Sequence, residues 1–249
     1  MQIAIFSDLH LRFQEKDQVA LFQDLLQKLL ENPEANSKGN ELWLLGDIFD
    51  VFIGPFPEWR DRCPGVFQVL ENLILAGWKI LWIQGNHDFY VEELLRPMGI
   101  EVSDSVVVRI INGKKIYLAH GDLVNQDDHK YLKWRAWTRS SSFKRALKWF
   151  YKSGGVRAIE ALALQMSRRS RKRGPSIDKT GEIQSIFRSF ARLKKREGYD
   201  MVILGHSHIE ESLNSDDSCF LNLGSWVNYS PRYALWDPEK ESFPKIQLS

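Results

Sequence analysis

The sequence has few of the features that mark exported, membrane-spanning or cysteine-zinc proteins. Its 249 residues include two cysteines, Cys63 and Cys219, without CxxC spacing, which argues against a disulfide framework or a thiolate zinc site. No apolar run approaches the roughly 18 residues of a spanning helix. The first residues, MQIAIFSDLHL, lack a basic start, a long apolar stretch and a small-residue cleavage site, so they do not resemble a signal peptide. We therefore expect a cytoplasmic protein that does not cross a membrane.

Acidic residues are scarce in one part of the chain. Residues 130–196 contain 20 Lys and Arg but only Glu160, Asp178 and Glu182, which gives the segment a charge of +17. The rest of the chain carries −15, and the whole chain +2. This asymmetry indicates that one region, rather than the whole protein, faces a polyanionic partner or an anionic surface.

Short apolar runs alternate with helical patterns in the first half of the chain. Runs at residues 2–7, 42–45 and 79–83 predict buried strands. A leucine stripe at 21–29 and the stretch 66–76 predict helices between them. The alternation predicts an α/β fold.

The second half adds other elements to this pattern. Asn112-Gly113 lies between two strand-like runs and supplies the positive φ angles of a tight hairpin turn. Residues 127–196 have a helical pattern rich in basic and aromatic side chains. Strand patterns resume at 201–204, 218–223 and 227–236. We expect one mixed α/β domain over residues 1–249, with 127–196 as a helical insertion within it.

Five blocks of potential metal ligands each follow a strand-like run. They are Asp8-Leu9-His10, Gly46-Asp47-Ile48-Phe49-Asp50, Gly85-Asn86-His87-Asp88, His120-Gly121-Asp122 and Gly205-His206-Ser207-His208. Loops at the carboxyl ends of strands are where open α/β sheets build their sites. One such block alone is commonly an ordinary hydrogen-bonded pair, but five of the six histidines lie in these blocks and only His129 lies outside.

The chemistry of these ligands favours borderline divalent ions. Asp, His and Asn without Cys suit Mn²⁺, Fe²⁺ or Zn²⁺ better than soft ions or Ca²⁺. Two ions need a bridging ligand, and an Asp supplies two oxygens for it. Ions about 3.5–4 Å apart can activate a bridging water and orient a phosphoryl group. The sequence therefore predicts a two-metal phosphoesterase, with Mn²⁺ as the expected metal.

In this order, the blocks resemble those of the calcineurin-like metallophosphoesterase family. The resemblance covers most of the chain outside the insertion and implies a four-layer α/β/β/α sandwich. It also implies two metal positions that share a bridging aspartate. One metal would bind Asp8, His10, Asp47 and His208, and the other Asp47, Asn86, His120 and His206.

The same resemblance gives roles to neighbouring residues. His87 falls at the family's catalytic histidine, where it would act as a general acid or stabilise the phosphoryl oxygens as a cation. Asp88 would orient and polarise the His87 ring. We expect Asp50 and Asp122 to hold ligands in place rather than bind metal.

The flanking sequence resembles that of the UDP-2,3-diacylglucosamine hydrolases of lipid A biosynthesis. The shared features are SDLHL, GDIFDVFIG, HGD followed by Asp127-Asp128, the helical insertion before GHSH, and NLGSW near the C-terminus. Those enzymes cleave a pyrophosphate to UMP and the lipid 1-phosphate, and the resemblance implies that the insertion forms a lid over the acyl chains. That group commonly carries Arg where this chain has His87, the residue of the wider family.

The insertion region supplies the candidate substrate contacts. Asp128 matches an acidic substrate-contacting position by its spacing from His120, and Asp127 is an equally good alignment. Basic candidates for the pyrophosphate are Arg168, Arg169, Arg171 and Lys172. The +17 charge beside several tryptophans also suits an anionic leaflet, on the inner face of the cell's inner membrane. Alternatively, the aromatic side chains pack the insertion onto the core and the charges are solvated.

Two other functions fit parts of the sequence. A nuclease or cyclic-nucleotide phosphodiesterase could use the same metal core, with the basic insertion following a nucleic-acid backbone, but no recognisable nucleic-acid module is present. A non-catalytic scaffold would be expected to have lost a ligand, and the ligand set is intact. The expected partner is therefore a phospholipid-like nucleotide rather than a nucleic acid.

Overall fold

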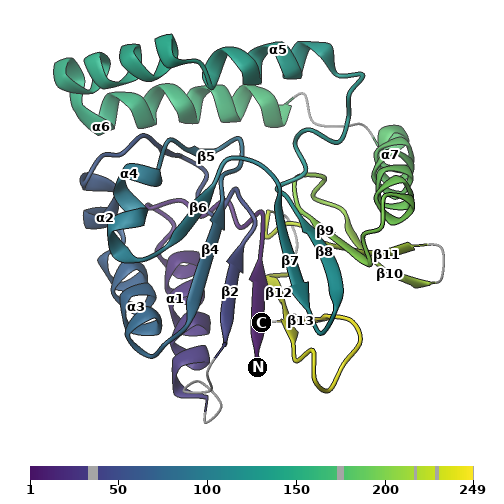
Figure 1. The fold of residues 1–249 in the computed structure, drawn as a ribbon. Coiled ribbons are helices and arrows are strands. Elements are labelled where there is room, and N and C mark those ends of the chain that lie inside the picture. Colours follow the sequence, from purple (N-terminus) through teal and green to yellow (C-terminus); the bar gives the residue numbers. More distant parts are fainter. Residues whose placement is uncertain (33–38, 173–176, 216–217, 228–229, 249) are drawn as a thin grey trace.

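Two facing β-sheets, with helices on both outer sides, form the body of the molecule (Figure 1). The computed structural model describes residues 1–32, 39–172, 177–215, 218–227 and 230–248. The strand order is β13-β12-β1-β2-β4-β6 in the first sheet and β10-β11-β9-β8-β7 in the second. The predicted mixed α/β fold, with its four α/β/β/α layers, is confirmed.

The first sheet is built on parallel strands joined through helices. Its strands are β1 (Ile3–Phe6), β2 (Glu41–Leu44), β4 (Lys79–Ile83), β6 (Glu101–Ser103), β12 (Arg232–Trp236) and β13 (Lys245–Leu248). The first four are parallel, and β12 and β13 are antiparallel additions at one edge. The helices beside it are α1 (Lys16–Glu31), α2 (Glu58–Arg62), α3 (Pro64–Leu75) and α4 (Glu92–Leu95), followed by a 3₁₀ turn at Arg96–Met98.

The second sheet contains the predicted hairpin. Its strands are β7 (Val107–Ile111), β8 (Lys114–Leu118), β9 (Met201–Leu204), β10 (Glu210–Ser215) and β11 (Ser218–Leu223). Asn112 and Gly113 turn between β7 and β8 with φ angles of 50° and 77°, as the dipeptide predicts. A two-stranded sheet of β3 (Phe52–Ile53) and β5 (Asp88–Phe89) lies apart from both large sheets.

The central strand β1 shows why its sequence is apolar throughout. Ile3 and Ile5 pack between the two sheets, whereas Ala4 and Phe6 pack in the core beneath the helices. Side chains alternate between the faces of a strand, and both faces of this sheet are covered. A continuous apolar run therefore replaces the alternation of a half-exposed strand, and it holds the loop after β1 on a rigid base.

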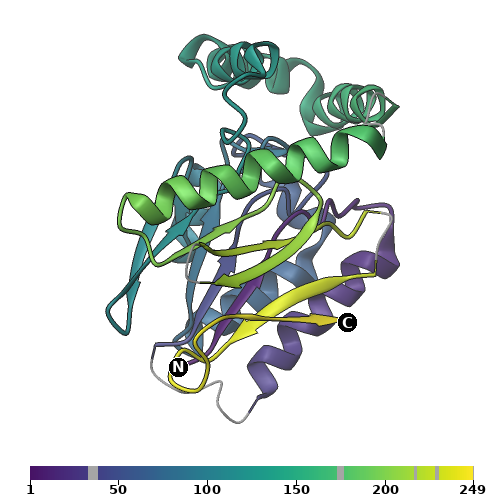
Figure 2. The same cartoon turned by 90° about the vertical axis from the view of Figure 1, so that its right-hand side faces the viewer.

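Helix α7 (Ile177–Arg196) forms the fourth layer (Figure 2). Phe187 and Ala191 are buried against Tyr117, Val202 and Phe220 of the second sheet. The sequence analysis placed this segment inside the insertion. In the structure, the described side chains of α7 from Ile183 on pack on the second sheet, whereas α5 and α6 project from the fold. The bounds of the insertion stay a prediction.

Helices α5 (His129–Thr138) and α6 (Ser141–Lys172) lie across the carboxyl ends of β1, β2 and β4 (Figure 1). α6 is broken at Gly155, whose φ of 67° and ψ of −179° are not helical. No helix in the described part of the chain is long and apolar enough to cross a bilayer.

The inner face of the insertion is fastened to the core by paired side chains. Tyr151 stacks on Phe56 with ring centroids 4.0 Å apart and donates a 2.6 Å hydrogen bond to Glu58. The buried Glu160 carboxylate accepts hydrogen bonds from Arg62 and Gln14. Part of the insertion therefore packs onto the core, as the alternative interpretation of its aromatic content expects.

Two other aromatic rings of the insertion are exposed. Trp149 is 70% exposed and Trp137 is 59% exposed. Packing against the core therefore does not explain why the insertion carries these two tryptophans. Both rings can contact an external surface.

Candidate metal centre

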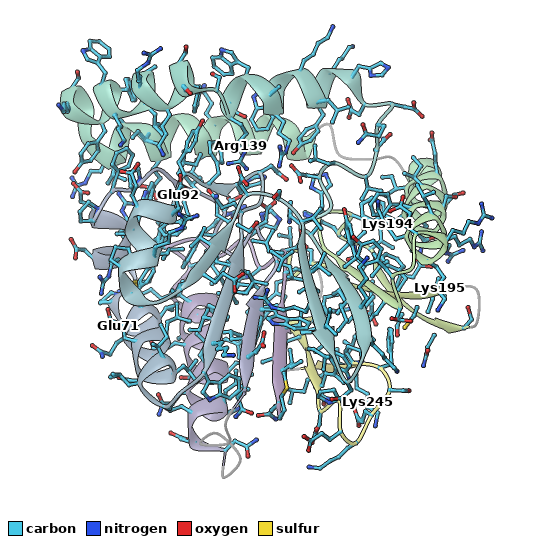
Figure 3. All side chains as sticks on the ribbon, in the orientation of Figure 1. Glu71, Glu92, Arg139, Lys194, Lys195 and Lys245 are labelled. Carbon is cyan, nitrogen blue, oxygen red and sulfur yellow. The ribbon has the colours of Figure 1, made fainter. Side chains whose placement is uncertain are left out.

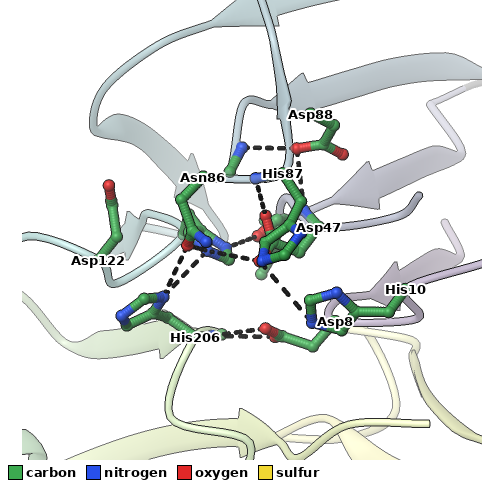
Figure 4. Close-up of polar contacts among 12 residues, drawn as sticks. Asp8, His10, Asp47, Asn86, His87, Asp88, Asp122 and His206 are labelled. Carbon is green, nitrogen blue, oxygen red and sulfur yellow. Dashed lines mark hydrogen bonds and ion pairs between the residues drawn. The ribbon is translucent and has the colours of Figure 1, made fainter. Parts of the chain in front are cut away.

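The strand ends bring the predicted ligands together, as Figure 4 shows for most of them. They follow β1 (Asp8, His10), β2 (Asp47), β4 (Asn86), β8 (His120) and β9 (His206, His208). Three overlapping sets of these side chains and His87 have candidate ligand atoms within 4.8 Å of one another. Strands from both sheets contribute, so the centre exists only where the sheets face each other.

The backbone at this centre is held in an uncommon conformation. Positive φ angles occur at Asp8 (54°), His10 (48°), Asp47 (54°), His206 (68°) and His208 (58°). Non-glycine residues adopt this region rarely, and strained positions of this kind cost about 1–3 kcal/mol each. The fold maintains this strain at five of the seven predicted ligands, which is typical of a functional site.

Two glycines permit the close approach of the loops. A Cβ on Gly85 would lie 2.1 Å from Asp47 Oδ1, and a Cβ on Gly205 would lie 2.3 Å from Asp8 Oδ2. Both distances are shorter than any tolerated contact. These glycines are required because carboxylates from other strands occupy the space of a side chain.

One group of ligand atoms gathers around His10 and His208. Their Nε2 atoms are 2.9 Å apart, and His208 Nε2 lies 3.5 Å from Asp8 Oδ1. The opposite nitrogen of His10, Nδ1, faces Asp50 Oδ1 at 3.8 Å. Two imidazole nitrogens and a carboxylate oxygen are all electron-pair donors, so a cation among them would satisfy all three.

A second group gathers around Asn86. Its Oδ1 lies 3.1 Å from His120 Nε2 and 3.0 Å from His206 Nδ1. On its far side, His120 donates Nδ1–H to the Leu45 carbonyl at 2.9 Å. This hydrogen bond fixes the tautomer, so Nε2 presents its lone pair to the centre, as in a histidine that binds metal.

Asp47 lies between the two groups. Its Oδ2 is 3.7 Å from His10 Nε2 and 3.5 Å from His120 Nε2. Its Oδ1 accepts the backbone N–H of His87 at 2.8 Å. Oδ2 is therefore the Asp47 oxygen that faces both groups of ligand atoms.

Burial and charge shift the pKa values of these side chains. Burial raises the pKa of Asp8 to about 7, and burial together with neighbouring His120 lowers the pKa of His206 to about 3. Burial also opposes the charge on His120, but Asp47 outweighs it and raises the pKa of His120 to about 10. The buried carboxylates thus favour a positive charge beside them, either a proton on His120 or a divalent ion in its place.

His87 lies beside this centre and is oriented by Asp50. The His87 ring donates Nδ1–H to the Asp50 carbonyl at 2.8 Å, and Nδ1 lies 3.5 Å from Asp50 Oδ1. Arg12 holds the other carboxylate oxygen of Asp50 at 3.0 Å. The Nε2 atom of His87 is therefore the one that can exchange a proton with a substrate.

Asp88 has a different environment from the one expected. Its Oδ1 accepts the backbone N–H groups of Asp47 and Gly85 at 2.9 and 2.7 Å, and Oδ2 accepts that of Ile48 at 2.9 Å. The sequence analysis expected Asp88 to orient the ring of His87, but Asp50 makes that contact. Asp88 instead ties the β2 and β4 loops together, a role that no sequence motif identifies.

Asp122 connects the centre to helix α5. Its carboxylate accepts hydrogen bonds from the Tyr131 hydroxyl, at 2.8 Å, and from Arg135. Tyr131 also lies against the ring of His206, with centroids 5.8 Å apart. The sequence analysis missed Tyr131 and Arg135. Their spacing of four residues, which puts them on one face of a helix, is the signal that could have found them.

Of the six residues proposed to contact substrate, the structure describes the side chains of two. The Asp128 carboxylate caps α5 by accepting the Tyr131 N–H at 3.0 Å, and Asp127 is exposed. The side chains of Arg168, Arg169, Arg171 and Lys172 lie outside the described residues. Substrate binding by these six residues stays a prediction.

Comparison with known proteins identifies the family. A model described as calcineurin-like phosphoesterase matches residues 1–210. The chain belongs to this family.

The chain is 28% identical to a UDP-2,3-diacylglucosamine hydrolase of Haemophilus influenzae over 231 residues, or 90% of each chain. It is 28% identical to one of Aliivibrio fischeri over 239 residues, or 92% of each. A solved archaeal phosphodiesterase shares the fold over the whole of both chains, with a TM-score of 0.50 and 18% identity.

Family and geometry agree on the class of chemistry. Calcineurin-like phosphoesterases use divalent metal ions, and this chain places Asp and His side chains where such ions can be held. The protein is therefore a metal-dependent phosphoesterase or pyrophosphatase.

Proposed function

We propose that this phosphoesterase cleaves the pyrophosphate of UDP-2,3-diacylglucosamine, releasing UMP and 2,3-diacylglucosamine 1-phosphate in lipid A biosynthesis. The main support is the similarity to hydrolases of that name over about nine-tenths of both chains. A match of that length extends well beyond the metal-ligand blocks. The insertion lies directly above the strand ends that carry the centre, where it would cover the acyl chains.

The side chains of the centre have distinct parts in this reaction. Two divalent ions, proposed as Mn²⁺ with Fe²⁺ or Zn²⁺ as alternatives, would polarise the phosphoryl group and activate a water. Asp47 would help to hold both ions, and the backbone N–H of His87 keeps one of its oxygens fixed. His87 presents Nε2, the nitrogen not bonded to Asp50, to the leaving group.

The direct test is hydrolysis of the lipid nucleotide by the purified protein. We expect UMP release in the presence of Mn²⁺, loss of activity in EDTA, and recovery on adding Mn²⁺ back. Bis(p-nitrophenyl) phosphate serves as a matched general substrate. If the protein cleaved this diester, DNA or a cyclic nucleotide but left UDP-2,3-diacylglucosamine intact, the proposed substrate would be wrong and the nuclease or phosphodiesterase alternative would be favoured.

We further propose that the outer face of the insertion rests on an anionic membrane surface at the inner face of the inner membrane. Trp137 and Trp149 of the insertion are exposed, and aromatic rings beside basic residues are typical of helices that lie in a membrane interface. The basic run at 168–173 adds five positive charges to the same insertion.

Neutralising that run should weaken membrane association. Each basic residue near an anionic leaflet contributes about 1 kcal/mol, so replacing Arg168, Arg169, Arg171, Lys172 and Arg173 by Gln should weaken binding about 10³- to 10⁴-fold. Sedimentation with phosphatidylglycerol-containing vesicles measures this. The control carries Lys195→Gln and Arg196→Gln at the end of α7. Equal vesicle binding by wild type and the five-residue variant would mean that this run is only solvated.

A further inference from the structure

Arg139 turns from the end of α5 toward the loop that carries two site residues. Figure 3 places its side chain between the insertion and the body of the fold. Its Nη2 donates a 2.6 Å hydrogen bond to the Gly85 carbonyl. That carbonyl belongs to the peptide unit joining Gly85 to the ligand Asn86. The guanidinium is thus one peptide unit away from the metal centre.

Asp122 and Asp88 attract this guanidinium only from a distance, without contact. In the part of the chain that the structure describes, no carboxylate lies within 4.0 Å of Arg139, whereas Arg135, one turn earlier, is paired with Asp122. The carboxylate of Asp88 accepts three backbone N–H groups instead. Burial and the neighbouring Arg135 lower the pKa of Arg139. Sequestering a charge without a carboxylate in contact is costly, so a ligand that supplies negative charge would be bound favourably here.

The geometry of the group restricts what this ligand is. The guanidinium carbon lies 4.1 Å from the centroid of the Phe89 ring, so the ring covers one face of the plane. The N–H donors of an arginine point outward in that plane, and the Gly85 carbonyl uses one of the five. The remaining donors form a planar fork that matches two oxygens of one phosphate.

We propose that Arg139 binds the phosphate of a diphosphate substrate that is not held by the metal ions. The inference rests on the proposed function, because it needs a substrate with two adjacent phosphates. One phosphate would occupy the metal centre and its neighbour the fork of Arg139. Because Arg139 belongs to the insertion and Gly85 to the loop after β4, the bound diphosphate would also join the insertion to the catalytic loop.

A comparison of UDP with UMP binding tests the phosphate-binding role of Arg139 without any lipid. Binding to the Mn²⁺-loaded protein is measured by calorimetry in excess Mn²⁺. Wild type should bind UDP more tightly than UMP. Arg139→Gln should weaken UDP binding by about 10- to 100-fold, the loss of a hydrogen bond to a charged group, with UMP binding nearly unchanged. Arg139→Lys keeps the charge without the fork and should lose a smaller part of the preference.

The matched control is Lys148→Gln, which removes a cation of the same insertion that is already paired with Glu93 at 3.0 Å. It should leave the preference for UDP unchanged. Equal weakening of UDP and UMP in Arg139→Gln, or an unchanged preference in both Arg139 variants, would overturn the inference. Failure of the lipid assay with the UDP preference intact would refute only the proposed substrate. Absence of the preference in wild type would refute the phosphate role even if the lipid were cleaved.

Discussion

Asp47→Asn should abolish phosphodiester hydrolysis, with a loss of at least about 10³-fold in kcat/KM. One Asp47 oxygen is held by the His87 N–H, so the other alone faces both groups of ligand atoms. In the variant, the amide oxygen would stay on that N–H and its NH₂ group would point at the metal positions, where it cannot bind a cation. Loss of paired ions removes several kcal/mol of transition-state stabilisation, and each 1.36 kcal/mol is tenfold in rate.

Two measurements on the same samples test this explanation. Metal content by elemental analysis should fall from two ions to one or none, and circular dichroism should show an unchanged fold. Asp24→Asn, a change of the same chemistry at an exposed position of α1, should behave as wild type. A variant that kept both ions and more than a tenth of the activity would contradict the bridging role.

The sequence predicts several side chains that the structure brings together at the centre, but it does not predict the contacts that orient them. Asp8, His10 and Asp47 stand in short blocks directly after apolar runs, so sequence spacing reveals them. The Leu45 carbonyl that fixes the tautomer of His120 is 75 residues away in sequence. A main-chain carbonyl has no residue type of its own, so a motif carries no sign of it. The same is true of the Asp50 carbonyl that orients His87.

The fold was predictable where apolar patterns were strong. Clear patterns predict β1 and β4, which have apolar runs, and the hairpin turn, which has Asn112-Gly113. β10 was missed because its sequence, EESLNS, is polar and its strand pairs only with β11 at the edge of the sheet, through backbone hydrogen bonds. Backbone pairing leaves little trace in side-chain hydropathy.

The sequence pattern of helix α7 has a related limit. Ile183, Phe187 and Phe190 form an apolar stripe, which predicts a helix that packs on something. The stripe does not identify the partner, and packing on the insertion would need the same residues as packing on the second sheet. Only the contacts with Tyr117 and Phe220 place α7 in the fourth layer.

His87→Gln should lower kcat by about 10²- to 10⁴-fold on a substrate with a poor leaving group, the usual contribution of a general acid. The Asp50 carbonyl accepts Nδ1–H of His87, so Nε2 is the nitrogen that can deliver a proton. The Gln side chain can donate a hydrogen bond but cannot transfer a proton at neutral pH. Metal content should stay at the wild-type level, because the seven predicted ligands are unchanged.

Leaving groups of different quality separate the two roles considered for His87. A p-nitrophenyl phosphodiester departs without protonation, whereas the phenyl analogue needs it more, so a general acid predicts a larger loss on the phenyl substrate. His129→Gln, at the one histidine outside the five blocks, should change neither rate. Equal losses on both substrates would instead indicate that His87 acts as a cation on the phosphoryl oxygens, because that stabilisation does not depend on the leaving group. Full activity on both would exclude His87 from the reaction, and its position beside Asp47 would then serve only to hold the bridging carboxylate through the backbone N–H.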